Sequence, residues 1–370
     1  MLLVIFGAGA SYDSVPHRPP PMNFIGALDR PPLANELFGD RPEFVRLMER
    51  FGGCRAHIPR LRRHGVAVEQ ELAKLQSAAV VYPKANSELA SILYYIRYAI
   101  DECERRWRSH HRGITNYVTL LREIDRWRHE LNERVLFVTF NYDTMLESAI
   151  VQELKLLIGS LSDYISQPNY RLIKLHGSTN WGRTVDVARE RYIPYPRGQN
   201  ISDPGLVSRF QNQLISDAQE VTQRLTDQFH VIPTSEMLMF NDQIVFPAIA
   251  LPIDKKDEFS CPDDHVKALA DWIPGVTKIL TIGWRATETK FLEMLRSRLT
   301  GLKGAPQLLI VSGSIDGARE TFDNLGPEIT KGGASSLHKG FSGLIIEEFD
   351  DLLAWLRGFL IKGFPAGASV

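Results

Sequence analysis

The sequence has little cysteine, little net charge and no long apolar run, and each shortage excludes a class of protein. Its three cysteines, Cys54, Cys103 and Cys261, lie far apart without a CxxC pair, which argues against a disulfide framework and a zinc site of the usual spacing. The 43 Lys and Arg balance 44 Asp and Glu, so the formal net charge of −1 requires no polyanionic partner. No stretch has the length of a membrane span, and the apolar residues 1–6 are too few for a signal peptide. We expect a soluble protein of the reducing cytoplasm, without a metal site.

The 370 residues have a globular composition, with 44% hydrophobic and 24% charged residues. Apolar runs and helical spacing alternate along most of the chain. We predict strands at 2–6, 135–140, 171–175, 278–282, 307–311 and 344–346, and helices at 87–107, 117–131, 287–299, from 315 onward and at 350–360. This alternation predicts an α/β fold, a Rossmann-like doubly wound parallel sheet with a large helical insertion or second lobe.

Composition divides the chain into five expected segments. Residues 1–34 hold the first strand and its glycine turn, 35–133 a helical insertion, 134–183 core with polar motifs, 184–242 an irregular inserted lobe, and 243–362 the remaining core with a C-terminal helix. Proline is dense between 15 and 32, so we predict a loop there that lies near whatever the first turn binds.

The turn after the first strand contains Gly7 and Gly9. At this place in a doubly wound sheet, glycines let the backbone approach a dinucleotide diphosphate, and the next helix offers free N–H groups to the anion. The usual GxGxxG fingerprint would need glycine at position 12, which is Tyr12 here, so an ordinary dehydrogenase is disfavoured. A tight turn without any ligand remains an alternative.

Polar groups also follow the second and third predicted strands. Asn141 and Asp143 follow one, and His176 follows the other. Because the carboxyl ends of parallel strands meet at one crevice, we expect these groups to converge on the glycine turn. His176 is the group among them that titrates near neutrality. The alternative is structural, with Asn141 and Asp143 capping the next helix and His176 serving packing alone.

Three motifs in this order, GAGAS at 7–11, TFNYD at 139–143 and KLHGS at 174–178, resemble the sirtuin superfamily. NYDTMLE at 141–147 and LHGSTNW at 175–181 are more specifically similar to bacterial sirtuin-like domains of anti-phage defence systems. Gly283-Trp284 and Ser312-Gly313-Ser314 stand where that family has its later nucleotide-contacting loops. The resemblance covers about residues 1–185 and 275–350.

The resemblance implies that Asn141 and His176 are the catalytic residues. It also implies a set of NAD-binding residues, namely Gly7, Ala8, Gly9, Ser11, Asp143, Gly283, Trp284 and Ser312. Protein-deacylating sirtuins carry a zinc module with paired cysteines, which this sequence lacks. The expected activity is therefore that of a zinc-free NAD+ hydrolase, which cleaves NAD+ to nicotinamide and ADP-ribose and acts in defence by depleting NAD.

Two other functions stay open: an NAD-dependent protein deacylase or ADP-ribosyltransferase, and a non-catalytic module that senses NAD or ADP-ribose. We expect a homo-oligomer with a trigger, which would be a helicase-type ATPase, an argonaute-like protein or a phage component. Two basic runs, 55–64 and 105–112, are interpreted as solvated helix ends rather than nucleic-acid contacts. Trp181 and Trp284 each adjoin a predicted site loop, where they either stack on a base or belong to the core.

Overall fold

The computed structural model describes residues 1–15, 30–62, 67–196, 203–232, 238–253, 259–300 and 304–359. The chain forms two compact units. The first comprises Met1–Pro31, Arg106–His176 and Lys255–Val370, and the second comprises Pro32–Arg105 and Gly177–Asp254. Most of the predicted loop at 15–32 lies outside the described residues.

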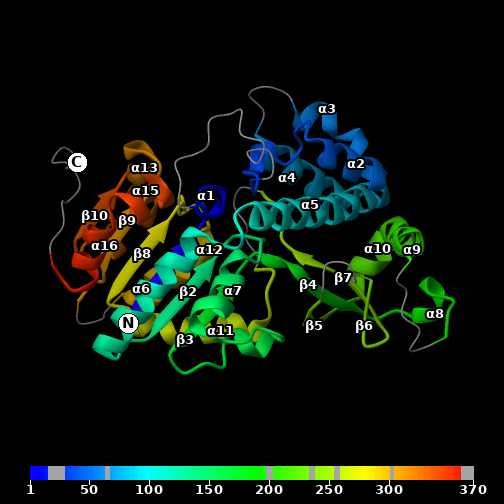
Figure 1. Cartoon of the computed structure of the whole chain (residues 1–370). Helices are drawn as coiled ribbons and strands as arrows, with labels where there is room; N and C mark the ends of the chain where they lie inside the picture. The colour runs from blue at the N-terminus through cyan, green and yellow to red at the C-terminus, as the bar shows by residue number, and fades with distance from the viewer. Residues whose placement is uncertain are drawn as a thin grey trace. The chain divides into compact units, whose positions relative to one another are not determined.

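The first unit contains a six-stranded sheet in which all neighbouring strands are parallel (Figure 1). Its strands are β1 (Leu2–Phe6), β2 (Val135–Thr139), β3 (Tyr170–Lys174), β8 (Lys278–Ile282), β9 (Gln307–Val311) and β10 (Ala334–Leu337). They lie in the order β10-β9-β8-β1-β2-β3. The chain thus places β2 and β3 on one side of β1 and then crosses to the other side for β8, β9 and β10. This is the Rossmann strand order, and it confirms the predicted fold class.

Both faces of this sheet are covered, as the burial of its central strands shows. Every residue of β1 and β2 is buried, although successive side chains point to opposite faces. The helices of this unit are α1 (Ala8–Tyr12), α6 (Asn116–Leu131), α7 (Met145–Ala149), α11 (Asp263–Trp272), α12 (Thr289–Leu299), α13 (Ile315–Leu325), α14 (Pro327–Thr330), α15 (Gly340–Ile346) and α16 (Phe349–Leu356). Shorter helical turns are η4 (Ile150–Leu154), η5 (Leu161–Tyr164) and η7 (Ile273–Gly275).

The strand predicted at 344–346 is wrong, because these residues belong to helix α15. The last sheet strand is instead β10, whose short sequence ASSL has two partly buried and two buried residues. An edge strand needs little apolar surface, so β10 carries no strong sequence signal. The apolar residues 344–346 fit a helix equally well, since a short apolar run does not distinguish the two structures.

The second unit combines helices with a four-stranded sheet of order β5-β4-β7-β6, whose strand pairs are antiparallel. Its strands are β4 (Gly177–Val185), β5 (Leu225–Val231), β6 (Met239–Phe240) and β7 (Gln243–Ile249). Its helical elements are η2 (Ala34–Glu36), α2 (Pro42–Arg50), η3 (Gly52–Ala56), α3 (Ile58–Leu61), α4 (Val68–Ala79), most of α5 (Pro83–His110), α8 (Arg189–Tyr192), α9 (Pro204–Ser216) and α10 (Ala218–Gln223).

The prediction of an irregular lobe at 184–242 is wrong for much of that segment. Helix α9 buries Val207, Phe210 and Leu214 on one face. Pro204 occupies the first turn of α9, and the carboxylate of Asp203 accepts a hydrogen bond from the backbone N–H of Leu206. Proline at the first helical position starts a helix rather than breaking one, so the prolines of this segment do not make it irregular.

The two long predicted helices are confirmed as α5 and α6. Helix α6 belongs to the unit of the parallel sheet, whereas most of α5 belongs to the other unit. Within the described part of the chain, none of the helices combines the length and the apolar character needed to span a membrane.

Candidate functional site

Two backbone turns pack against each other where the strand order of the parallel sheet reverses. Gly7 and Gly9 follow β1, and Gly283 follows the neighbouring strand β8. A Cβ on Gly7 would lie 2.5 Å from the carbonyl oxygen of Gly283, and a Cβ on Gly283 would lie 2.4 Å from the backbone nitrogen of Ala10. Gly283 also has φ of +59°, in the left-handed region that glycine tolerates. These positions therefore require glycine for close approach of main chain to main chain.

Hydrogen bonds join the two turns. The N–H of Gly7 donates to the carbonyl of Ile282 at 3.0 Å, and the N–H of Gly9 donates to that of Gly283 at 3.1 Å. The N–H of Ala10 donates to the carbonyl of Gly7 at 2.9 Å. The expectation that the N–H groups after Gly9, in the next helix, are free for an anion is therefore wrong for Ala10. The hydrogen bonds of Gly9 and Ala10 fix the turn instead.

Asn141 connects the loop after β2 to the glycine turn. Its side-chain amide nitrogen lies 2.9 Å from both the carbonyl oxygen of Gly7 and the hydroxyl oxygen of Ser11. It lies 3.4 Å from the hydroxyl of Tyr117 on α6. The Ser11 and Tyr117 hydroxyls are themselves 3.1 Å apart. Because the amide hydrogens of Asn141 point into this buried cluster, its carbonyl oxygen is the end of the amide with which it can meet a substrate.

Tyr117 and Asp143 support the same loop. Burial, followed by the nearby charge of Asp143, raises the pKa of the Tyr117 phenol well above its ordinary value. Tyr117 therefore remains a neutral hydroxyl. The Asp143 carboxylate accepts a hydrogen bond from the backbone N–H of Met145 at 3.2 Å, at the start of α7. This bond holds the loop between β2 and α7 in shape at Asp143.

His176 lies in the turn after β3 and is 4% exposed. Its Nδ1 lies 3.2 Å from the carbonyl oxygen of Phe140, the residue before Asn141. A carbonyl only accepts, so Nδ1 carries a proton, and in the neutral form of the ring the lone pair is then on Nε2. The ring of His176 also packs on Phe140, with centroids 4.9 Å apart.

Trp284 also packs on Phe140. The two rings are stacked, with centroids 5.5 Å apart and planes 9° apart. The indole N–H of Trp284 donates to the carboxylate of Glu288 at 2.6 Å. Trp284 is 5% exposed and Trp181, on β4 of the second unit, is 0% exposed. Both tryptophans therefore have the core placement that was one of the alternatives.

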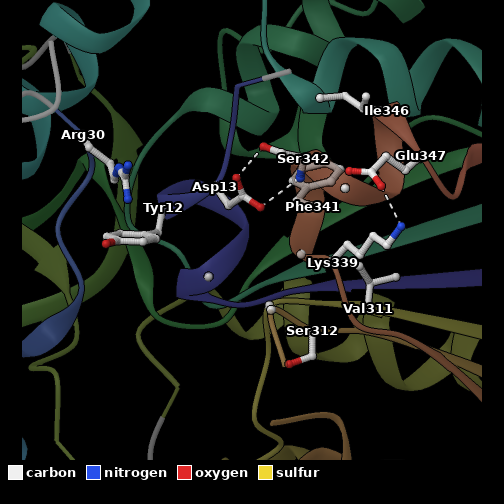
Figure 2. A pocket seen from close by; sticks show the side chains of 15 residues that line it. Tyr12, Asp13, Arg30, Val311, Ser312, Lys339, Phe341, Ser342, Ile346 and Glu347 are labelled. Carbon is white, nitrogen blue, oxygen red and sulfur yellow. Dashed lines mark hydrogen bonds and ion pairs between the residues drawn. The ribbon is translucent and has the colours of Figure 1, made fainter. Parts of the chain in front are cut away.

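A cavity of about 610 Å³ opens beside the glycine turn, within the first unit (Figure 2). That volume lies in the range of about 300–1,000 Å³ that is typical of ligand sites. It is lined by residues at the ends of β1, β8, β9 and β10 and in the segments that follow them: Gly9, Tyr12, Asp13, Arg30, Gly283, Val311, Ser312, Gly313, Lys339, Gly340, Phe341, Ser342, Gly343, Ile346 and Glu347. The cavity thus extends from β1 toward β10, away from the β3 end that carries His176.

The cavity wall carries charges of both signs. The guanidinium of Arg30 lies 4.2 Å from the centre of the Tyr12 ring. Lys339 and Glu347 form an ion pair of 2.6 Å, and Asp13 accepts hydrogen bonds from the backbone N–H and the hydroxyl of Ser342 (Figure 2). Burial raises the pKa of Asp13, although these hydrogen bonds and the charge of Arg30 oppose the shift.

The predicted residues therefore fall into three groups, with Ala8 outside them. Gly9, Gly283 and Ser312 line the cavity. Six others do not line it and form two clusters: Gly7, Ser11, Asn141 and Asp143 around the first turn, and His176 and Trp284 around Phe140. Ala8 is exposed at the start of α1.

Sequence reasoning missed Tyr117, the partner of Ser11 and Asn141. It also missed the polar side chains of the cavity wall: Asp13, Arg30, Lys339, Ser342 and Glu347. Tyr117 stands at the start of a predicted amphipathic helix, and the direction of its hydroxyl depends on tertiary packing. Ser342 and Glu347 lie beside the segment predicted as a strand. Of these residues, Asp13 is the one that the sequence could have suggested as a site residue, because it is polar and directly follows α1 and the glycine turn.

Among the described residues, no group of three or more His, Cys, Asp and Glu side chains is placed to hold a metal ion. Comparison of the chain with protein-family models and with curated proteins finds no match.

Proposed function

We propose that the chain is an NAD+ hydrolase that releases nicotinamide and ADP-ribose. The observation that carries the proposal is a pair of hydrogen-bonded contacts. The side chain of Asn141 is hydrogen-bonded to the glycine turn, and His176 is hydrogen-bonded to Phe140, the residue before Asn141. Dinucleotides bind at the point where the strand order of such a sheet reverses. The motifs at 7–11, 139–143 and 174–178, which resemble those of sirtuin-like domains, agree with this placement.

A two-ended substrate suits the arrangement of the polar groups and the cavity. Asn141 follows β2, whereas the cavity runs past the ends of β8, β9 and β10. Neighbouring strands are about 4.8 Å apart, so the ends of β2 and β9 are separated by roughly 14 Å. A mononucleotide would not reach both regions. NAD+, with two nucleosides joined by a diphosphate, would place its adenosine in the cavity and its nicotinamide riboside near Asn141 and His176.

Cleavage of the bond between nicotinamide and ribose develops positive charge at the anomeric carbon, as in glycoside hydrolysis. Water adds to that carbon, the bonding electron pair passes to the ring nitrogen, and nicotinamide leaves neutral. We assign to His176 the acceptance of the proton of the attacking water at Nε2, worth about 10²–10⁴-fold in rate. The carbonyl oxygen of Asn141 would hold that water or a ribose hydroxyl. Arg30 and Lys339 would offset phosphate charge.

The resemblance extends the proposal to biology. We propose an anti-phage effector that depletes NAD+, since that is what the resembled defence domains are known to do. Continuous hydrolysis would harm the host, so the proposal includes a resting state and a trigger, either a partner defence protein or a phage component. Assembly into a homo-oligomer belongs to the same proposal.

The test follows nicotinamide and ADP-ribose release by the purified chain, with and without the product of a neighbouring gene. Wild type is compared with His176→Asn, which keeps an amide near the position of Nδ1 but removes the titrating ring, and with Asn141→Ala. His129→Asn is the matched control, because His129 is a mostly exposed residue of α6. Both site variants should lose at least about 100-fold in kcat, and the control none.

Three results would redirect the proposal. Full turnover in both site variants would contradict the assigned roles. Formation of acyl-ADP-ribose from an acylated peptide, or of an ADP-ribosylated acceptor, would indicate a transferase. NAD+ or ADP-ribose binding without nicotinamide release, under every activating condition, would indicate a sensing module.

A further inference from the structure

The loops that carry Asn141 and His176 are tied together by three hydrogen bonds. Each bond runs from the end of β3 to the end of β2 or to the loop after it, and its acceptor is a backbone carbonyl. The pairs are the Leu175 N–H with Thr139 at 3.2 Å, His176 Nδ1 with Phe140 at 3.2 Å, and Lys174 Nζ with Asp143. The two loops therefore hold each other in position.

The third bond involves a lysine with no exposed surface. Lys174 is 0% exposed, and its Nζ also lies 2.8 Å from a carboxylate oxygen of Glu147, whose side chain is 7% exposed. The same oxygen accepts a hydrogen bond from the Tyr164 hydroxyl at 3.2 Å. The other Glu147 oxygen is buried and has no hydrogen-bond partner among the described residues.

Stability does not explain this pair. Removing two charges from water costs more than their attraction commonly returns, and apolar residues of similar volume often replace a buried ion pair without loss of stability. An incompletely hydrogen-bonded carboxylate adds to the cost. What an apolar pair would not provide is the donor that holds the Asp143 carbonyl.

We infer that Lys174 and Glu147 are positioning residues for the reaction, an inference that rests on the proposed function. Lys174 fixes the loop from Asn141 to Asp143 against the turn of His176, and Glu147 fixes the ammonium of Lys174. Neither residue lines the cavity, which lies toward the β10 edge of the sheet. Their removal should therefore impair the chemical step and leave nucleotide affinity unchanged.

The test replaces the pair as a unit with apolar residues, Lys174→Met together with Glu147→Leu, in the full chain. We expect kcat for nicotinamide release to fall at least about tenfold, and the Kd for ADP-ribose and the KM for NAD+ to change less than about twofold. The matched control is Arg122→Met with Glu153→Leu, which removes an exposed pair of 3.0 Å and should leave kcat unchanged.

Two outcomes of the kinetic test would overturn the inference. One is an unchanged kcat in a folded double variant. The other is a parallel loss of kcat, of ADP-ribose affinity and of Tm, which a purely structural role would produce. If the double variant fails to fold, Lys174→Gln supplies a smaller change, because the amide NH₂ still donates hydrogen bonds. This variant should retain more of kcat than Lys174→Met.

A second readout separates this inference from the proposed function. The ¹⁵N NMR signals of His176 report whether Nδ1 carries the proton, whatever the chain does to NAD+. In wild type the Nδ1–H form should dominate, and in the Lys174→Met, Glu147→Leu variant the two tautomers should mix. If wild type releases no nicotinamide, the proposed function fails, and an unchanged His176 signal in the variant would then overturn the positioning role as well.

Discussion

Gly283 and Gly313 show how differently two glycines of one cavity wall are constrained. Gly283 has φ of +59°, and a Cβ there would lie 2.4 Å from a backbone atom of the opposite turn, whereas a Cβ on Gly313 would meet nothing within 4 Å. Both residues line the cavity. Substituting each glycine in turn therefore distinguishes two effects: the loss of a backbone conformation that favours glycine, and the addition of a methyl group to the cavity wall.

We predict that Gly283→Ala costs more than about 1–2 kcal/mol of stability, since the left-handed conformation alone costs that much and the clash adds to it. The displaced turn should also abolish ADP-ribose binding. Gly313→Ala should remain close to wild type in both respects. Thermal unfolding and calorimetric titration with ADP-ribose test this, and equal tolerance of the two substitutions would contradict the packing described for the turns.

Tyr117→Phe tests the buried cluster at a single hydroxyl. Ser11 and Asn141 keep each other as partners after the change, so the stability loss should be about 0.5–1.5 kcal/mol. If the hydroxyl also helps to orient Asn141, nicotinamide release should fall by roughly 2–10-fold. Tyr82→Phe is the control, because Tyr82 is 63% exposed and lies in the second unit, outside this cluster and outside the cavity lining. A loss of activity as large as that of Asn141→Ala would contradict a merely supporting role.

At the scale of elements, Asp13 links the end of α1 to the start of α15. Its carboxylate accepts hydrogen bonds from the Ser342 backbone N–H, at 2.9 Å, and from the Ser342 hydroxyl. The side-chain amide of Asn116 donates to the carbonyls of Asp13 and Val15, at 2.7 and 2.9 Å, which joins α6 to the same point. These bonds help to explain why 340–346 is helical: the helix start is hydrogen-bonded by a residue far away in the sequence.

The pH dependence of stability should report on this link. Burial raises the pKa of Asp13 in the folded protein, so the folded state binds a proton there more tightly than the unfolded chain does. This contribution disfavours folding near neutral pH, and the penalty disappears as the pH falls toward the ordinary carboxyl pKa of 3.8. The Tm of wild type should therefore rise relative to that of Asp13→Asn as the pH is lowered from 7 toward 4.5. A Tm difference that is constant over that range would contradict the prediction.

The sequence predicted most elements of the parallel sheet and the three loops of the site, because buried strands and glycine turns carry strong local signals. It did not predict β10 or the helix at 340–346, since both depend on neighbours that are distant in sequence. It also did not predict the cavity. Lys339 and Glu347 carry no motif, and they acquire a position only when β10 takes the edge of the sheet.

At the scale of the whole molecule, the separation of the cavity from the polar loops predicts a preference for dinucleotides. In the His176→Asn variant, which should not consume its ligand, NAD+ and ADP-ribose should raise Tm more than AMP or nicotinamide mononucleotide at equal concentration. A ligand present at 100 times its Kd raises the free energy of unfolding by about 2.7 kcal/mol. Differential scanning fluorimetry measures this, and equal shifts by AMP and NAD+ would show that only the adenosine half is held.

The central strand has consequences for biosynthesis. Leu2 pairs with Val135 on one side and with Lys278 on the other, so β1 remains without both neighbouring strands until they have been synthesised. At about 5–20 residues per second, the delay between synthesis of β1 and synthesis of β8 is on the order of ten seconds or more. Gly283, which follows β8 and packs against the turn after β1, is synthesised late. We therefore expect ribosome-bound fragments that end before that glycine to bind no nucleotide.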